Sequence, residues 1–309
     1  AMERFKPNLV LLDLQMPKLG GIGTLRIARK RFPRSNIIML SKASGSAADL
    51  TVRALEAGAL DFICKPGEGS AEASDKYLKE KLAPFVSLAA ERLKIDDYRE
   101  EEHPSPEPSL KKSSAAHDLV AIGASTGAPG ALVHVVPRFP RSLSVPVLVV
   151  VHLPAAFSRS LARQLSSRSV LPVVVPEHGD LLLGGRVYIA PGDRHIRIIA
   201  KHGSKDKHIH ISQDGDSASP YRPSFDILLQ SIARLNSHCL AVVMTGMGSD
   251  GKKGVAELKE QDSGHYCLVQ SSDSCVVSSM PDAIVAADLA DEEAHLDDIP
   301  RRILRLVGE

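Results

Sequence analysis

The stretch HDLVAIGASTGAPGALVHVV, residues 117–136, decides how the second half of the chain is interpreted. An apolar run ends in a turn that contains Gly123, Ser125 and Gly127, and apolar residues at helical spacing follow. Glycine permits a tight turn and close packing of a helix on a strand. Such turns lie at the carboxyl ends of strands, where α/β sheets bind ligands. The stretch therefore predicts a strand, a turn with a functional role, and a helix.

Three interpretations of this turn compete. In the first, Ser125 or Thr126 caps the following helix. In the second, the glycines form a dinucleotide-binding loop, but the next apolar run ends in His152 where an acidic residue is expected, and the turn has no lysine for a phosphate loop. In the third, Ser125 is a nucleophile, which needs a base within reach and a third group that orients the base.

The chain supplies both partners of a nucleophile. His152 ends the apolar run VPVLVVVH, 145–152, and Asp250 lies in the glycine-rich turn of LAVVMTGMGSDG, 240–251. Because the carboxyl ends of parallel strands share one edge of a sheet, we expect these two residues and Ser125 at that edge. A lone histidine at a strand end is usually structural, but three such residues beside glycine or proline turns favour a Ser-His-Asp triad.

The organisation of the chain indicates two α/β domains, 1–95 and 117–309. In the first, the apolar runs NLVLLDL (8–14), NIIMLSK (36–42) and DFICKP (61–66) alternate with helical patterns, which predicts a parallel sheet. A charged segment rich in proline and serine, 96–116, is expected to be a linker. In the second domain RHIRIIAKHGSKDKHIHIS (194–212) predicts a hairpin and hence a mixed sheet.

Bulk properties exclude several classes of protein. The chain has 309 residues, 43% of them hydrophobic, and a net charge of +1 with both signs interspersed, which does not favour nucleic acid or an anionic membrane surface as a partner. No apolar run is long enough to span a bilayer, so we expect no membrane insertion. Four cysteines without a C-x-x-C pair suit a reducing compartment, and a cytoplasmic location is expected.

A series of segments in the second domain resembles a known family. GASTGAPGAL, VPVLVVVHLPAAFSRSLARQL, GRVYIAPGDRHI, PSFDILLQSIA, MTGMGSDG and SCVVSSMPDAI are similar, in order, to the motifs of the chemotaxis protein-glutamate methylesterases. These are bacterial response regulators of two-component phosphorelays, in which a receiver domain controls an esterase. The resemblance implies a receiver (flavodoxin-like) segment, truncated here, followed by a doubly wound, mostly parallel α/β methylesterase domain.

The resemblance also implies roles for individual residues. Ser125 becomes the nucleophile, His152 the general base and Asp250 the group that orients the imidazole. The backbone at Met247 lies near the reacting carbonyl and Thr126 lies beside the nucleophile, both as oxyanion or substrate-binding residues. The implied reaction is hydrolysis of glutamate methyl esters on methyl-accepting chemotaxis receptors, without a cofactor for the esterase, and with glutamine deamidation as a companion activity. An alternative is a non-catalytic response-regulator module that only binds receptors.

The front segment resembles the second part of a receiver domain. Asp13 matches the phosphoacceptor, Ser41 the switch hydroxyl and Lys65 the lysine that pairs with the phosphoryl group. In an intact parent the resemblance implies Mg²⁺ and a chemotaxis histidine kinase as phosphodonor. No first strand and no acidic pair precede Asp13, so we predict that this chain is not phosphorylated normally and that inhibition by the receiver is weak or lost.

Histidines of the predicted hairpin raise the possibility of a metal site. His202, His208 and His210 cluster in sequence, and two histidines on one strand face can bind a transition metal. Lysines surround them and no carboxylate or cysteine completes the set convincingly, so a solvated hairpin is favoured. His178, Asp180, Asp193 and His195 border loops and receive no role.

Overall fold

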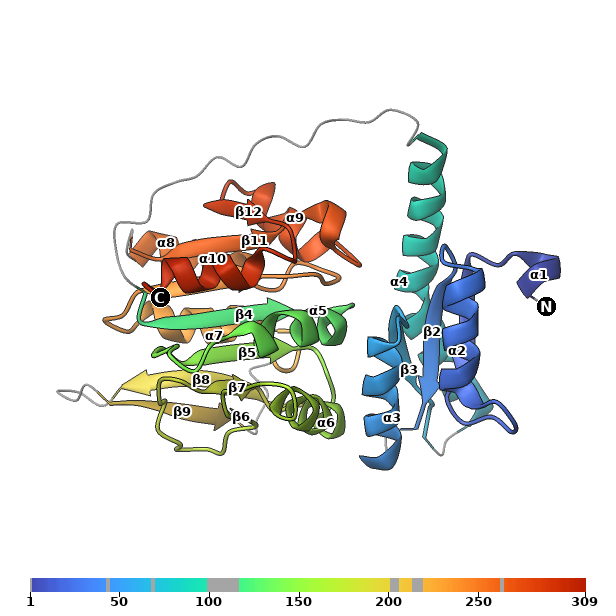
Figure 1. Cartoon of the computed structure of the whole chain (residues 1–309), viewed down its shortest axis with the longest axis horizontal. Helices are drawn as coiled ribbons and strands as arrows, with labels where there is room; N and C mark the ends of the chain where they lie inside the picture. Colours follow the sequence, from blue (N-terminus) through green and yellow to red (C-terminus); the bar gives the residue numbers. More distant parts are fainter. Residues whose placement is uncertain are drawn as a thin grey trace. The chain divides into compact units, whose positions relative to one another are not determined.

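The computed structural model describes residues 2–42, 45–67, 70–98, 117–200, 206–212, 219–261 and 264–309, with backbone alone for 91–98. The chain divides into two compact units, Ala1–Glu107 and Pro108–Glu309 (Figure 1). Most of the predicted linker, 96–116, lies outside the described residues. No helix in the described ranges is long and apolar enough to cross a membrane.

The first unit is built on a three-stranded parallel sheet in the order β1-β2-β3. Its elements are α1 (Met2–Phe5), β1 (Leu9–Asp13), α2 (Gly20–Arg31), β2 (Asn36–Ser41), α3 (Gly45–Glu56), β3 (Asp61–Cys64) and α4 (Ala71–Tyr98). The three strands lie where the apolar runs predicted them. Helix α4 continues through Pro84. Strand β1 is at the edge of the sheet and its Leu11 is 44% exposed.

The second unit contains a seven-stranded sheet in the order β12-β11-β10-β4-β5-β7-β6. All of its strand pairs are parallel. The strands are β4 (Leu119–Ala124), β5 (Val147–Val151), β6 (Val173–Val174), β7 (Val187–Ile189), β10 (Cys239–Val243), β11 (Tyr266–Gln270) and β12 (Glu292–Ala294). The chain enters at β4, builds one half outward, and returns to β10 on the other side of β4. The β4–β10 boundary is thus the switch point of the sheet, where ligands bind in such folds.

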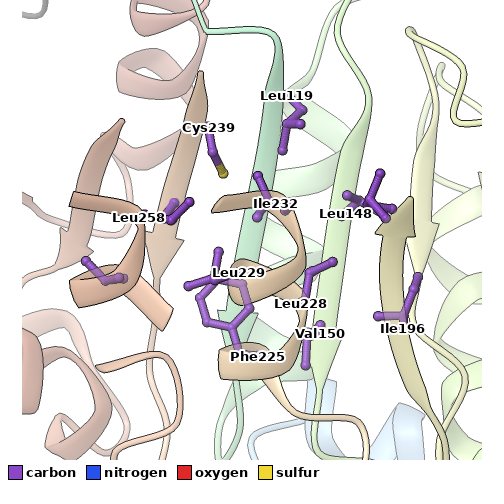
Figure 2. Packing of buried hydrophobic residues seen from close by; sticks show 14 of the residues in the cluster. Leu119, Leu148, Val150, Ile196, Phe225, Leu228, Leu229, Ile232, Cys239 and Leu258 are labelled. Atoms are coloured by element: carbon purple, nitrogen blue, oxygen red, sulfur yellow. The ribbon is translucent and has the colours of Figure 1, made fainter. Parts of the chain in front are cut away.

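Helices cover both faces of this sheet (Figure 1). They are α5 (Ala128–Val135), the short helix η1 (Val136–Arg138), α6 (Ala155–Ser166), α7 (Phe225–Ala233), α8 (Lys252–Gln261), the short helix η2 (Ser272–Ser274), α9 (Ser279–Val285) and α10 (Ile299–Leu306). Figure 2 shows α7 packed against the central strands, with Phe225, Leu228 and Ile232 among the apolar side chains of the buried cluster. Burial of such side chains is the main favourable contribution to folding. It fixes the start of α7 against the middle of the sheet.

The predicted hairpin forms, but the prediction of a mixed sheet is wrong. Strands β8 (His195–Ala200) and β9 (Lys207–Ser212) pair antiparallel in a two-stranded sheet of their own. Ile196, Ile198 and Ile209 belong to the same buried cluster as the apolar face of α7. The hairpin therefore buries its apolar face against α7 instead of extending the edge of the seven-stranded sheet.

Candidate active site

The turn after β4 presents Ser125 at the switch point. The Ser125 N–H donates to the Thr245 carbonyl at 3.0 Å, which ties the turn to the end of β10. Helix α5 has Gly127 as its N-cap residue, with φ +83° and no side-chain cap bond. The helix-cap interpretation of Ser125 and Thr126 is therefore wrong. A Cβ on Gly127 would lie 2.6 Å from Cβ of Val276, so the site requires glycine for both conformation and space.

The three residues predicted as a triad are brought together. His152, directly after β5, has Nδ1 at 3.1 Å from Oγ of Ser125 and Nε2 at 2.8 Å from Oδ2 of Asp250. The strands that lead to them, β10, β4 and β5, are neighbours in the sheet. A nucleophile, a base and an orienting carboxylate in this arrangement are the geometry of an activated serine.

Asp250 is buried at 2% exposure and all of its acceptor sites face donors. Oδ1 accepts from the Ser224 hydroxyl at 2.9 Å and from the Asp226 N–H at 3.0 Å, and Oδ2 accepts from the Phe225 N–H at 2.6 Å as well as from His152. Burial acts most strongly and raises the pKa of Asp250, but the hydrogen bond and charge of His152 and the backbone donors hold the pKa below its usual value. Asp250 is thus a carboxylate that can accept from an Nε2–H of His152.

Packing around Gly123 explains why α7 can supply those donors. A Cβ on Gly123 would lie 2.2 Å from Cδ1 of Phe225, and a Cβ on Gly251 would lie 2.7 Å from the same atom. The Phe225 ring therefore packs directly on the backbone of β4 and of the turn after Asp250. This contact brings the first turn of α7 onto the Asp250 carboxylate. The N–H groups of that turn have no acceptor within the helix and are free to bind the carboxylate.

Thr126 and Met247, predicted as oxyanion or substrate-binding residues, each follow a residue whose backbone N–H is already hydrogen-bonded. The N–H groups of Ser125 and Gly246 donate to the carbonyls of Thr245 and Val277. Within the described residues the N–H groups of Thr126 and Met247 have no acceptor. These two backbone donors therefore stand next to Ser125 with their hydrogen-bonding capacity unused.

Sequence reasoning did not single out three residues of this site, Tyr221, Ser224 and Asp226. Asp226 accepts from the N–H groups of Gly251 and Gly254 at 2.9 and 2.7 Å, and Tyr221 stacks on the His152 ring. Burial, opposed by these N–H donors and reinforced by the neighbouring Asp250 charge, raises the pKa of Asp226 to about 6. The Ser-x-Asp pattern at the start of PSFDILLQSIA is a helix-start signal that draws attention to two of the three.

The residues predicted in the first unit lie at the carboxyl edge of its sheet. Nζ of Lys65 is 2.5 Å from Oδ2 of Asp13. This hydrogen bond has the largest effect and lowers the pKa of Asp13, although burial acts in the opposite direction. The Ser41 hydroxyl is buried and accepts from Thr51 of α3 at 2.7 Å. Lys65 thus binds Asp13, whereas the Ser41 hydroxyl is hydrogen-bonded to α3, the helix that follows its strand.

The hairpin histidines do not form a metal centre within the described residues, where no group of three or more metal-ligating side chains occurs. His210 stacks edge-on against His178 with ring centroids 4.7 Å apart, and His202 lies outside the described residues. Two of the loop residues to which no role was assigned, Asp193 and Asp180, accept hydrogen bonds from backbone N–H groups. Asp193 accepts from the Ala155 N–H at the start of α6, and Asp180 accepts from the Glu177 N–H.

Comparison with known proteins identifies the family. Residues 120–303 match CheB methylesterase, and residues 1–72 match the response regulator receiver domain. The chain belongs to the CheB methylesterase family. The predicted family resemblance and the predicted fold class, a receiver segment followed by a doubly wound methylesterase domain, are confirmed.

Relatives of this CheB methylesterase family member cover nearly its whole length. Proteins named protein-glutamate methylesterase/protein-glutamine glutaminase from Lawsonia intracellularis and Bacillus subtilis are 36% and 35% identical to it, over 98% and 99% of this chain and 87% of each relative. A crystal structure of the Thermotoga maritima CheB methylesterase catalytic domain is 34% identical and covers 62% of this chain and 100% of that chain, with a TM-score of 0.58. The likeness extends through both units.

Proposed function

We propose that the chain is a serine hydrolase that removes methyl groups from glutamate side chains, with Ser125 as nucleophile. The observation that carries this proposal is the chain of contacts from Ser125 through His152 to the buried Asp250, at the carboxyl ends of three adjacent strands. The names of the relatives supply the substrate class, a protein-glutamate methyl ester.

The first half-reaction follows from the hydrogen-bond directions. Asp250 accepts from Nε2–H of His152, which leaves the lone pair of Nδ1 facing the Ser125 hydroxyl. Nδ1 takes the proton as Oγ attacks the ester carbonyl, and the tetrahedral intermediate collapses when the same proton passes to the methoxide, which leaves as methanol. The glutamyl group is then bound to Ser125 as an ester.

The negative charge that develops on the carbonyl oxygen needs preorganised donors. The unused N–H groups of Thr126 and Met247 are the donors we assign to it. Removing one donor of this kind typically costs about 3 kcal/mol of transition-state stabilisation. The second half-reaction repeats the steps with water, activated by Nδ1, and releases the glutamate. An amide at the same carbonyl gives glutamine deamidation with ammonia as the leaving group.

The substrate proteins and the control of the enzyme extend this proposal. Methyl-accepting chemotaxis receptors are the substrate proteins that we assign to the relatives' protein-glutamate methylesterase activity. A cytoplasmic location belongs to the same proposal. The match of residues 1–72 to a receiver domain supports regulation by phosphorylation of Asp13 from a histidine kinase. Reduced phosphorylation and weak inhibition in this chain stay predictions.

Receiver phosphorylation is typically Mg²⁺-dependent, and the donor set around Asp13 does not match what Mg²⁺ requires. Asp13 forms an ion pair with Lys65. Among the described residues, Asp13 is not part of any group of three or more side chains that could bind a metal ion. Mg²⁺ demands near-octahedral oxygen ligands, with carboxylates and water as the usual donors. The described residues of the first unit therefore do not by themselves make up a magnesium site.

The test of the proposed function is methanol release from methylated receptor by the whole chain. Release is expected from the parent and from Ser166→Ala, an exposed serine at the end of α6 that serves as a matched control, and is expected to vanish in Ser125→Ala. Release that survives Ser125→Ala contradicts the assigned nucleophile. No release by folded parent protein favours the alternative, a module that binds receptors without catalysis.

A further inference from the structure

Tyr221 lies flat against the base of the triad. Its ring centroid is 4.4 Å from that of His152 and the two ring planes differ by 11°. Tyr221 belongs to the loop between β9 and α7, where its N–H donates to the Ser219 hydroxyl at 3.2 Å. Offset or stacked aromatic pairs at this separation are favourable beyond the area that they bury.

The hydroxyl end of Tyr221 reaches the turn after β10. A Cβ built on Gly248 would lie 2.2 Å from the Tyr221 Oη and 3.2 Å from Cζ. Gly248 has φ +99° and directly follows Met247, whose N–H we assign to the reacting carbonyl oxygen. Tyr221 therefore extends from the imidazole to the turn that carries a backbone donor.

The stacking of Tyr221 on the face of the His152 ring restricts tilting of the imidazole, which the two hydrogen bonds of His152 do not prevent. The bonds to Ser125 and Asp250 lie at the ring edge and fix the positions of Nδ1 and Nε2. They resist tilting about the line through those two atoms only weakly, whereas a flat aromatic ring on one face blocks it. The His152 side chain is 12% exposed, so Tyr221 also helps keep water from the base. An aromatic face additionally favours the imidazolium that forms during each half-reaction.

We propose that Tyr221 is a positioning residue for ester hydrolysis: its ring holds the His152 imidazole in line between Ser125 and Asp250, and its hydroxyl end sets the spacing to the Met247–Gly248 turn. The inference rests on the proposed function for its substrate, but not for its geometry. Tyr221 exchanges no proton and makes no covalent bond in this role.

The decisive variants are Tyr221→Phe, which keeps the ring, and Tyr221→Leu, which removes it. Three quantities are measured in the whole chain: kcat and KM for methanol release from methylated receptor, and the rate at which a fluorophosphonate labels Ser125. We expect Tyr221→Leu to lower both kcat and the labelling rate about tenfold with KM changed by less than about threefold, the size expected for one stacked pair. Tyr221→Phe should fall no more than about threefold in either rate.

The labelling rate separates this proposal from the proposed function because it needs no receptor. Normal labelling of the parent without methanol release would remove the substrate assignment and still leave Tyr221 tested by its variants. Labelling of Tyr221→Leu at the parent rate overturns the positioning role. So does a parent that is not labelled at Ser125 at all, since no activated nucleophile would then exist to position.

A second pair of variants tests the hydroxyl contact even if Tyr221→Leu fails to fold. Gly248→Ala should slow labelling because the new Cβ meets the Tyr221 hydroxyl and a residue with φ +99° is strained. Tyr221→Phe in the same chain removes that hydroxyl and should restore part of the rate. Equal rates in Gly248→Ala and in the double variant contradict the contact between Tyr221 and the turn.

Discussion

Asp250, which precedes α8, accepts hydrogen bonds from the start of α7, and Asp226, in the first turn of α7, accepts hydrogen bonds from the start of α8. Asp250, just before α8, receives the N–H groups of Phe225 and Asp226 at the start of α7. Asp226, in the first turn of α7, receives the N–H groups of Gly251 and Gly254 at the start of α8. Asp250, which we propose orients His152, is therefore bound by the N-terminus of α7, and Asp226 is bound by the N-terminus of α8. Helix N-termini favour negative charge nearby.

The first prediction concerns how this pair titrates. Burial above all raises the pKa of Asp226 to about 6, while the unfolded value is near 3.8, so the native state binds more protons than the unfolded state between these values. The contribution of Asp226 to the free energy of unfolding should therefore fall as pH rises from about 4 to about 6. Asp226→Asn retains an oxygen acceptor for Gly251 and Gly254 but cannot ionise. Urea midpoints of parent and variant between pH 4 and 7 should diverge in favour of the variant as pH rises; a constant difference would contradict the titration of Asp226.

Asp250→Asn should abolish most of the activity by changing the tautomer of His152. All four groups around the carboxylate donate to it, including two backbone N–H groups that cannot reverse. An NH₂ at the Oδ2 position forces His152 to accept through Nε2 and to carry its proton on Nδ1, which removes the base for Ser125. An NH₂ at the Oδ1 position meets the Asp226 N–H instead.

We expect kcat for methanol release by Asp250→Asn to fall by about 10⁴-fold, the size of effect known for the wrong tautomer in another triad. The fluorophosphonate labelling rate of Ser125 should fall with kcat. Nitrogen-15 shifts of His152 should show the proton on Nε2 in the parent and on Nδ1 in the variant. A variant that keeps its proton on Nε2 and still loses activity would contradict this explanation.

The loop after His152 depends on a glycine of another segment. A Cβ on Gly192 would lie 2.1 Å from the Leu153 carbonyl oxygen and 2.4 Å from the Ala155 nitrogen, which are backbone atoms that cannot rotate away. Gly192→Ala should therefore displace His152, lower the urea midpoint and slow methanol release together. Gly130→Ala is the matched control, because nothing lies within 4 Å of its Cβ, and in helix α5 it should stabilise by about 0.5–1 kcal/mol. Equal loss in both variants would contradict the packing argument.

The sequence predicts the strands and the triad because both depend on local patterns. Ser125 and His152 follow apolar runs directly, and parallel strands bring their ends to one edge without further information. Strand β12 was not predicted, because Glu292 and Glu293 give it no apolar pattern. It exists through pairing with β11 and through Arg302, which lies 2.9 Å from the buried Glu292 carboxylate.

The remaining features depend on contacts between segments that are distant in sequence. Tyr221 reaches His152 only because α7 is anchored on Gly123 by Phe225, a relationship that no spacing reveals. The hairpin was predicted from its alternation, but its separation from the large sheet depends on the apolar face of α7. Similarly, Gly127 and not Ser125 is the N-cap residue of α5, in a turn that the Ser125 N–H ties to Thr245 of a distant segment.

Thr245 should prove necessary for a correctly held nucleophile turn. Thr245 is 1% exposed, and its hydroxyl donates to the Thr126 carbonyl at 3.0 Å and accepts from the Val277 N–H at 3.0 Å. Thr245→Val keeps the shape of the side chain but leaves those two buried backbone groups without a partner, at a cost of about 1–3 kcal/mol in the free energy of unfolding. Thr245→Ser retains the hydroxyl and is the control.

Both variants keep the Thr245 carbonyl that accepts from Ser125, so the comparison isolates the hydroxyl. We expect a lower urea midpoint and slower fluorophosphonate labelling of Ser125 in Thr245→Val, and rates near the parent in Thr245→Ser. Because the lost bonds hold the turn and contact no substrate, KM should change less than kcat. If Thr245→Ser loses as much activity as Thr245→Val, the methyl group and its packing, and not the hydrogen bonds, hold the turn in place.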